Sequence, residues 1–130
     1  MAKNILIVGS GRQGISVAYD ILKNSEHNVI MSDVNHEVLD QAMSKISSIV
    51  TTTNLCSEVA DVKDSNAMLK LLENMDVMVS AVPYEFNLAL TELAIKSKTS
   101  MVDLGGHTNI VRQQLSKNQE AISAGITIVP

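Results

Sequence analysis

The chain has 130 residues, 45% of them hydrophobic, with a formal net charge of −4 at pH 7 and a single cysteine. This length suits one domain with a substantial core, and an acidic balance without blocks of like charge excludes nucleic acid and anionic membranes as main partners. One cysteine excludes an internal disulfide, and without a signal sequence or an apolar run of membrane-spanning length we expect a cytoplasmic protein.

The first predicted element is a strand over residues 4–8, which a glycine-rich loop connects to a helix. Gly9, Gly11 and Gly14 have the G-x-G-x-x-G spacing of a dinucleotide site. Gly9 would permit the tight turn, Gly11 would leave room for the pyrophosphate, and Gly14 would let the helix pack closely. The apolar face of the helix is formed by Ile15, Ala18, Tyr19 and Leu22. The phosphates would then lie on free amides at the helix N-terminus.

The second predicted strand, residues 28–32, is followed by Asp33. A carboxylate at this point can accept hydrogen bonds from the adenosine ribose and would repel a 2′-phosphate. The sequence therefore favours NAD as the cofactor over NADP. Arg12 weakens the preference for NAD if its side chain pairs with that phosphate; the alternatives are that it covers the adenine or remains solvated. The alternative role of Asp33 is to cap the next helix.

The next predicted helix follows Asn35, a suitable N-cap residue. Its apolar face is formed by Leu39, Ala42, Met43 and Ile46. A third strand is predicted within residues 55–60, where polar residues interrupt the apolar run. Asp61 and Val62 follow this strand, and they either wall the adenine or form an ordinary solvated turn.

A helix capped by Asp64 leads to a fourth predicted strand over residues 76–82. The apolar face of this helix is formed by Met68, Leu71, Leu72 and Met75. At the end of the strand, Ala81, Val82 and Pro83 are small or rigid residues that would let the backbone approach the nicotinamide half of the cofactor. The alternative is a plain strand end with a proline stop.

The fifth predicted strand, residues 100–104, follows another amphipathic helix. The apolar face of that helix is formed by Phe86, Ala89, Leu90, Leu93 and Ala94. Gly105 and Gly106 would allow close backbone approach to a ligand and would also form a tight turn. His107 could act there as an acid or base, but no second catalytic group accompanies it in the sequence, so a loop histidine is favoured.

The last predicted helix has Thr108 as its N-cap, stops at Gly125 and precedes a strand over residues 126–129. Its apolar positions are Val111, Leu115 and Ile122. The whole pattern predicts an α/β fold, a doubly wound parallel sheet (Rossmann fold) of about six strands in the order 3-2-1-4-5-6 with helices on both faces. Because Pro130 directly follows an apolar strand, we expect residues 1–130 to be the N-terminal, dinucleotide-binding domain of a longer enzyme.

Three blocks carry a more specific signal: ILIVGSGRQGISVAYDIL, DVMVSAVPYEFNLALTELAIKSKTSMVDLGG and AISAGITIVP. Together they resemble the N-terminal NAD(P)-binding domain of the saccharopine dehydrogenase-like family, especially its lysine 6-dehydrogenase branch. The resemblance implies an oxidoreductase that uses NAD or NADP on the CH–NH group of an amino acid in lysine-related metabolism.

The resemblance also implies which residues contact the cofactor. Those at the pyrophosphate would be Gly9, Ser10, Gly11, Arg12, Gln13 and Gly14, with Asp33 at the ribose. Those at the nicotinamide would be Ala81, Val82, Pro83 and Gly105. The family's substrate groups lie mostly in a second domain, so no catalytic residue is assigned and this chain alone is expected to be inactive.

A competing interpretation is a nucleotide-sensing regulatory domain of a potassium transport system, which has a similar loop, acidic residue and length. Its third strand usually ends in a Gly-Asp-Ala-like turn, whereas this chain has VADVKD, and SAVP and VDLGG fit it less well. No metal site is expected, because Cys56 lacks a ligand partner at a suitable spacing. The expected partners are a dinucleotide and, through the second domain, an amino-acid substrate, with a homo-oligomer left open.

Overall fold

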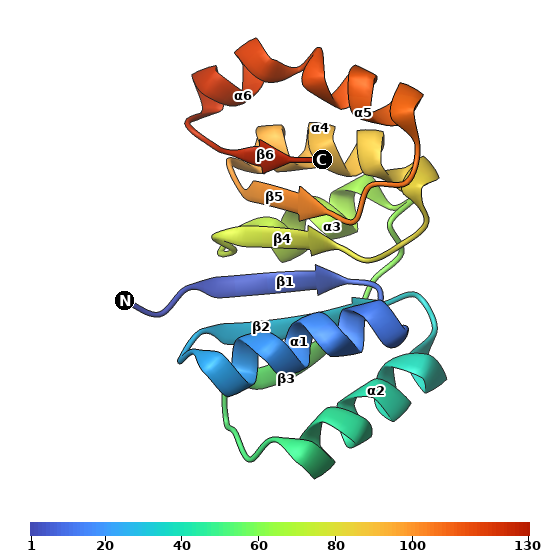
Figure 1. Cartoon of the computed structure of the whole chain (residues 1–130), viewed down its shortest axis with the longest axis vertical. Coiled ribbons are helices and arrows are strands. Elements are labelled where there is room, and N and C mark those ends of the chain that lie inside the picture. Colours follow the sequence, from blue (N-terminus) through green and yellow to red (C-terminus); the bar gives the residue numbers. More distant parts are fainter.

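The structure, a computed structural model, describes residues 1–130 and contains one six-stranded parallel sheet (Figure 1). The strands are β1 (Asn4–Val8), β2 (Asn28–Asp33), β3 (Leu55–Val59), β4 (Val77–Ser80), β5 (Ser100–Asp103) and β6 (Ile128–Val129). The helices are α1 (Arg12–Asn24), α2 (His36–Ile49), α3 (Ser65–Leu72), the 3-10 turn η1 (Tyr84–Phe86), α4 (Asn87–Ser97), α5 (Thr108–Leu115) and α6 (Asn118–Ala124). The strand order is β3-β2-β1-β4-β5-β6, which confirms the predicted doubly wound sheet. None of the helices combines the length and apolar character needed to cross a membrane.

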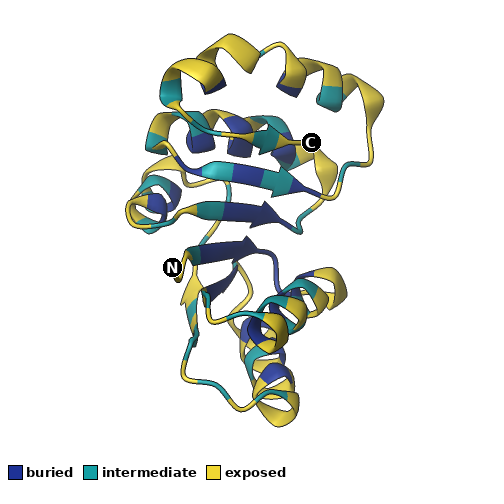
Figure 2. Cartoon of the chain, turned by 60° about the vertical axis from the view of Figure 1, so that its left-hand side comes forward, coloured by how far each residue is buried: buried dark blue, intermediate teal, exposed yellow.

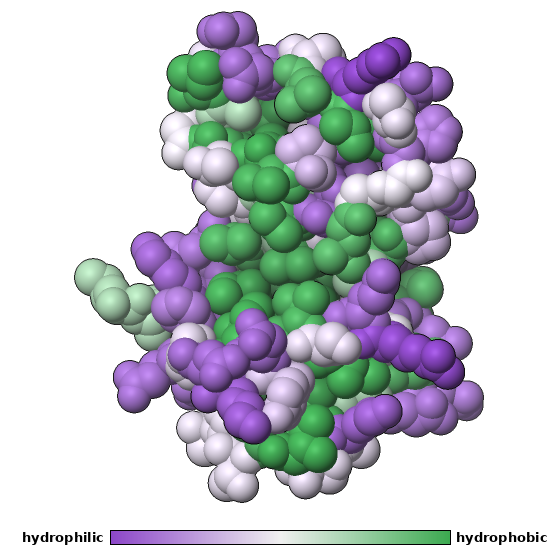
Figure 3. All heavy atoms as spheres, viewed as in Figure 1, coloured by the Kyte–Doolittle hydropathy of each residue, from purple (hydrophilic) through white to green (hydrophobic).

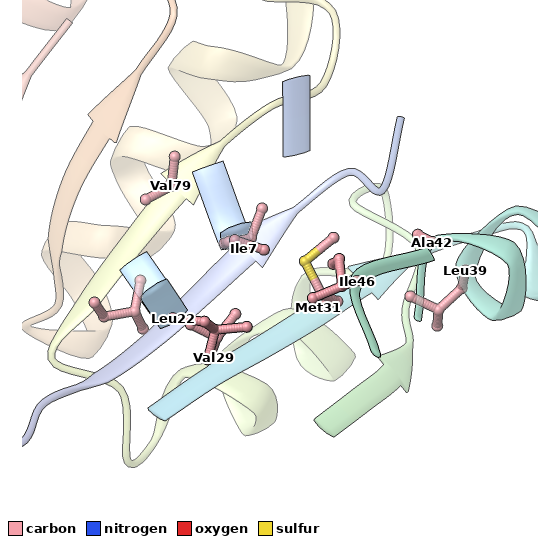
Figure 4. Close-up of a cluster of buried hydrophobic side chains, with 10 residues drawn as sticks. Ile7, Leu22, Val29, Met31, Leu39, Ala42, Ile46 and Val79 are labelled. Atoms are coloured by element: carbon pink, nitrogen blue, oxygen red, sulfur yellow. The ribbon is translucent and has the colours of Figure 1, made fainter. Parts of the chain in front are cut away.

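The side-chain alternation of β1 divides the core into two layers. Ile5 and Ile7 pack in a cluster with α1 and α2, while Leu6 and Val8 pack in a second cluster with α3 and α4. Figure 4 shows the first cluster, in which Leu22 of α1 lies near the strand side chains. Burial of each large aliphatic side chain contributes roughly 1.5–3 kcal/mol. Because both faces of β1 are buried from Ile5 to Val8, these four residues are all apolar, as expected for a central parallel strand.

The helices cover the sheet unequally. Helices α5 and α6 pack on α4, so no helix lies in front of β5 and β6 on the side that carries α1 (Figure 1). Val102 of β5 is half-buried there, and Val129 of β6 is 52% exposed. Figure 3 shows hydrophobic side chains gathered in the middle of this face, and Figure 2 shows burial concentrated in the central strands. On the face that carries α1, helices therefore cover β1–β3 but not β5 and β6, whereas α4 covers β4 and β5 on the other face.

Two of the predicted helix ends are confirmed by their hydrogen bonds. The Asn35 side chain accepts from the backbone N–H groups of Glu37 and Val38, and the Asp64 side chain accepts from that of Ala67. Gly125 ends α6 with a left-handed φ of 72°. The local capping signals in the sequence thus place these ends correctly.

The prediction for the last helix is wrong in three respects. The segment forms two helices, α5 and α6, with a break at Ser116 and Lys117. Thr108 is the first helical residue of α5 rather than its N-cap, which is His107. Leu115 and Ile122 are 58% and 61% exposed, because the break turns each helix independently toward α4.

Smaller differences concern the strands. Strand β4 is shorter than the predicted range 76–82, and the residues after it form a loop that reaches η1. Strand β3 lies at the sheet edge, where one side has no neighbouring strand. Cys56 of this strand is accordingly exposed. An edge strand needs less apolar sequence, which explains the weak signal of this segment.

Candidate functional site

The glycine loop connects β1 to α1 and begins at Gly9, whose φ of +101° is a conformation that other residues rarely adopt. The N–H of Gly9 donates to the carbonyl oxygen of Ser32 at 2.8 Å. A Cβ on Gly9 would lie 2.6 Å from the carbonyl oxygen of Ala81. The residue therefore allows both the turn after β1 and the close approach of the segment after β4.

Gly14 lies buried in the first turn of α1, directly over the loop. A Cβ at this position would overlap the carbonyl oxygen of Gly9, which belongs to the backbone and cannot rotate away. The close packing of helix against loop expected at this position is therefore present in the structure.

Gly11 differs from both, since no heavy atom lies within 4 Å of the position a Cβ would take. Gly11 is the N-cap of α1, and neither a capping side chain nor an acidic residue of the first turn satisfies the helix terminus. The free N–H groups of a helix terminus carry partial positive charge and bind phosphate. The space at Gly11 and the uncapped terminus beside it fit the pyrophosphate of a dinucleotide.

Ser10 is held inside the protein, with only 1% of its surface exposed. Its N–H and its hydroxyl both donate to Oδ2 of Asp33, each at 2.9 Å. Both donors of Ser10 are therefore used to connect the glycine loop to the end of β2. The family resemblance implied a role for Ser10 at the pyrophosphate, whereas its hydrogen bonds in the structure are with Asp33.

Asp33 ends β2, and its other carboxylate oxygen, Oδ1, accepts from the N–H of Asn35 at 2.9 Å. Partial burial alone would raise the pKa of this carboxyl, but hydrogen bonds from Asn35, Ser10 and Val34 outweigh it and hold the pKa below its usual value. Asp33 is therefore ionised at neutral pH, and its hydrogen bonds hold the carboxylate in position. Asn35, rather than Asp33, caps α2, so the capping alternative for Asp33 is wrong.

Arg12 and Gln13 are exposed on the first turn of α1. Both border a shallow hollow that reaches Leu104 after β5, and Arg12 also borders a second hollow between α1 and α2, beside Tyr19 and Lys45. The Arg12 side chain thus lies at the mouth of the loop and forms no salt bridge within the chain. This position leaves its three predicted roles open.

Asp61 and Val62 follow the edge strand β3. The Asp61 carboxylate accepts from the N–H of Lys63 at 2.9 Å, and its carbonyl accepts from the N–H of Asp64 at 3.0 Å. Val62 packs against the second core cluster. The predicted solvated turn is therefore present, and contact with the adenine stays a prediction.

The segments after β4 and β5 lie beside the glycine loop and beside each other. The N–H of Ala81 donates to the carbonyl oxygen of Val8 at 2.7 Å, which continues the β1–β4 pairing past the strand end. The N–H of Gly105, at φ 68°, donates to Oδ1 of Asp103 at 2.7 Å. Val82 is half-buried and Pro83 is exposed. The structure thus assembles the predicted nicotinamide residues from two adjacent strand ends.

A buried polar network that the sequence pattern did not reveal fixes these two strand ends. Nε2 of Gln114 donates to Oδ2 of Asp103 at 2.7 Å and to Oγ1 of Thr91 at 2.9 Å. The Ser80 hydroxyl donates to Oδ1 of Asn87 at 2.7 Å. All five side chains are buried, and Oε1 of Gln114 alone has no hydrogen-bond partner. The network ties β4 and β5 to α4 and α5 and so fixes the loop at Gly105.

A family model described as "Saccharopine dehydrogenase NADP binding domain" matches residues 5–129. Saccharopine dehydrogenase [NADP(+), L-glutamate-forming] of Saccharomyces cerevisiae is 28% identical over 129 residues, which are 99% of this chain and 27% of that protein. A Caenorhabditis elegans protein described as a probable 3-hydroxyacyl-CoA dehydrogenase is 29% identical over 100 residues, 72% of this chain and 33% of that protein.

The solved structure of apo saccharopine dehydrogenase (L-Glu forming) from Saccharomyces cerevisiae superposes with a TM-score of 0.78 at 27% identity, covering 98% of this chain and 26% of that one. A myo-inositol dehydrogenase from Corynebacterium glutamicum reaches 0.67 at 14% identity, covering 99% and 36%, and shows a common fold alone. The chain thus spans about a quarter to a third of the length of these relatives.

Proposed function

The chain belongs to the saccharopine dehydrogenase NADP-binding domain family, and from this premise we propose that it is the cofactor domain of an oxidoreductase acting on the CH–NH group of an amino acid. The observation that carries the proposal is the open space at Gly11 beside the uncapped N-terminus of α1. The family match also favours this function over the potassium-transport alternative, which none of the relatives described above supports.

Each part of the proposed site has a physical task. The first turn of α1 binds the pyrophosphate through free N–H groups. Asp33, held by Ser10, accepts hydrogen bonds from the adenosine ribose. The segments at Ala81 and Gly105 support the nicotinamide half, to which an amine carbon gives its hydride when the cofactor is bound. The chain thereby positions the cofactor against a substrate held elsewhere.

We further propose that residues 1–130 are the N-terminal domain of a longer enzyme of the saccharopine or lysine dehydrogenase type, located in the cytoplasm. The coverage of the relatives supports this, because most of their length lies outside the matched region. The lysine 6-dehydrogenase branch and the amino-acid substrate are part of the same proposal, supported by the sequence blocks quoted above.

Full-length polypeptide should reduce NAD or NADP in the presence of an amino-acid substrate, whereas the 130-residue chain should bind the cofactor with little or no turnover. The reason is that most of the length of the relatives lies outside the region that this chain matches, and the substrate groups are expected there. A screen of amino acids with both proteins, monitored by nicotinamide absorbance, measures this. Robust amine-dependent reduction of the cofactor by the 130-residue chain would contradict the proposal that turnover requires residues outside this chain. Reduction with hydroxy acids only would contradict the assignment of CH–NH groups as substrates.

NAD should stabilise the chain more than NADP, because the ionised Asp33 would face a 2′-phosphate. Asp33→Asn should remove most of this preference, a change on the order of tenfold in relative affinity, or about 1.4 kcal/mol. Thermal shift with each cofactor measures the preference. Glu26→Gln, an exposed residue between α1 and β2 at the opposite end of the strands, is the control for loss of one negative charge. The names of the family and of the yeast relative carry NADP. A larger shift with NADP for the unmodified chain would therefore assign the 2′-phosphate to a cation such as Arg12 and overturn our interpretation of Asp33.

A further inference from the structure

Two rings that follow different strands stack on each other beside the candidate site. Tyr84, the first residue of η1, and His107, the N-cap of α5, have ring centroids 5.0 Å apart and planes inclined by 20°. Tyr84 is 43% exposed, and His107 is also exposed. The pair is therefore an ordered aromatic surface that remains accessible to a ligand.

The backbone fixes this pair from both sides. Pro83 directly precedes Tyr84 with a φ of −52° and so restricts the entry to η1. Gly106 has a φ of +119°, and a Cβ on it would lie 3.4 Å from Cδ1 of Tyr84. The Tyr84 ring thus lies against the backbone at Gly106 as well as on the imidazole of His107. His107 makes no capping hydrogen bond from its side chain, so its imidazole is available for the stack.

The expected path of an extended dinucleotide across the sheet leads to Tyr84 and His107. With the ribose at Asp33 after β2 and the pyrophosphate at the N-terminus of α1, the rest of an extended dinucleotide crosses toward the ends of β4 and β5. The close approach of Gly9 to Ala81 makes this crossing short. Tyr84 and His107 follow those two strands by a few residues.

We infer that Tyr84 and His107 form a wall of the nicotinamide pocket, in which Tyr84 contacts the nicotinamide ring and His107 is a positioning residue that holds Tyr84. This inference rests on the proposed function. The Tyr84 ring can contact the nicotinamide ring as two aromatic side chains contact each other in proteins, in an offset or inclined arrangement. His107 therefore acts through its ring face rather than through proton transfer.

The contact can be tested by NMR on the 130-residue chain, because it has only two tyrosines and three histidines. Tyr19→Phe assigns the Tyr84 ring signals, and His107→Phe assigns those of His107. NAD or NADP should shift the signals of both rings, whereas ADP-ribose, which lacks nicotinamide, should bind and leave them unchanged. Equal shifts with ADP-ribose and with the full dinucleotide would overturn the inference and leave the proposed function intact. Failure of every one of these compounds to bind would overturn the proposed function, and the inference with it.

Two substitutions test the positioning role separately from folding. His107→Ala should weaken binding of the full dinucleotide roughly two- to tenfold, which is the range for loss of one aromatic contact, and leave ADP-ribose binding unchanged. His107→Phe keeps a ring under Tyr84 and should restore the affinity, although it cannot carry a proton. Unchanged ADP-ribose binding shows that each variant is folded. Equal affinity of all three proteins for the full dinucleotide, or equal loss in both variants, would overturn the positioning role.

Discussion

Gly14→Ala should strongly destabilise the chain and remove dinucleotide binding at the same time. The added Cβ would overlap the carbonyl oxygen of Gly9, so α1 and the loop after β1 must move apart. Forced overpacking typically costs about 1–3 kcal/mol, and more where backbone must shift, which is a large part of the roughly 5–15 kcal/mol that stabilises a domain. The measurement is urea unfolding followed by far-UV circular dichroism, together with cofactor binding.

Met43→Ala offers a matched control for Gly14→Ala. Met43 lies on α2 as a half-buried residue at the edge of the same core cluster, so its truncation lowers stability without touching the loop. We expect that variant to bind dinucleotide normally wherever it is folded. A Gly14→Ala protein as stable as the unmodified chain would show that the helix does not pack on the loop as described.

Gly11→Ala should have the opposite profile, with intact stability and impaired binding. Nothing in the protein lies within 4 Å of the added methyl group, and the φ of −74° at Gly11 suits alanine. We expect a stability loss of about 1 kcal/mol or less, because only the N-cap preference of glycine over alanine changes. The methyl group occupies the space assigned to the pyrophosphate, so affinity should fall by about 1–3 kcal/mol, or roughly five- to 150-fold.

Thermal shift and unfolding measurements on the same Gly11→Ala sample separate the two effects. At a free ligand concentration about one hundred times the dissociation constant, binding adds roughly 2.7 kcal/mol to stability, and at the same concentration the variant should lose about 1–2.4 kcal/mol of this increment. If the cofactor stabilises the variant as fully as the unmodified chain, the pyrophosphate does not lie at Gly11.

The parts of the fold and site that follow from local sequence were predictable. The glycine loop and the caps at Asn35 and Asp64 each depend on a few consecutive residues with a turn or capping preference. The strand order followed from the alternation of strands and helices, because crossovers between parallel strands are right-handed. The family resemblance came from such blocks as well, and the family match confirms it. The lysine 6-dehydrogenase branch stays a prediction.

The parts that were missed depend on residues brought together by the fold. Gln114 reaches Asp103 across the loop before α5, and Tyr84 meets His107 from another strand end. A sequence pattern contains no signal for either contact, although a glutamine at a buried helix position and a Pro-Tyr pair after a strand would justify a search. The exposed Leu115 was mispredicted because helical periodicity was carried through a break in the helix.

The most direct test of the account is a calorimetric titration of the 130-residue chain with NAD and with NADP, beside the Gly11→Ala variant. We predict saturable binding of one dinucleotide per chain, and markedly weaker binding to the variant although its unfolding curve is nearly unchanged. Absence of binding by both dinucleotides, or equal affinity for the two proteins, would contradict the claim that the glycine loop at the start of α1 is a cofactor site.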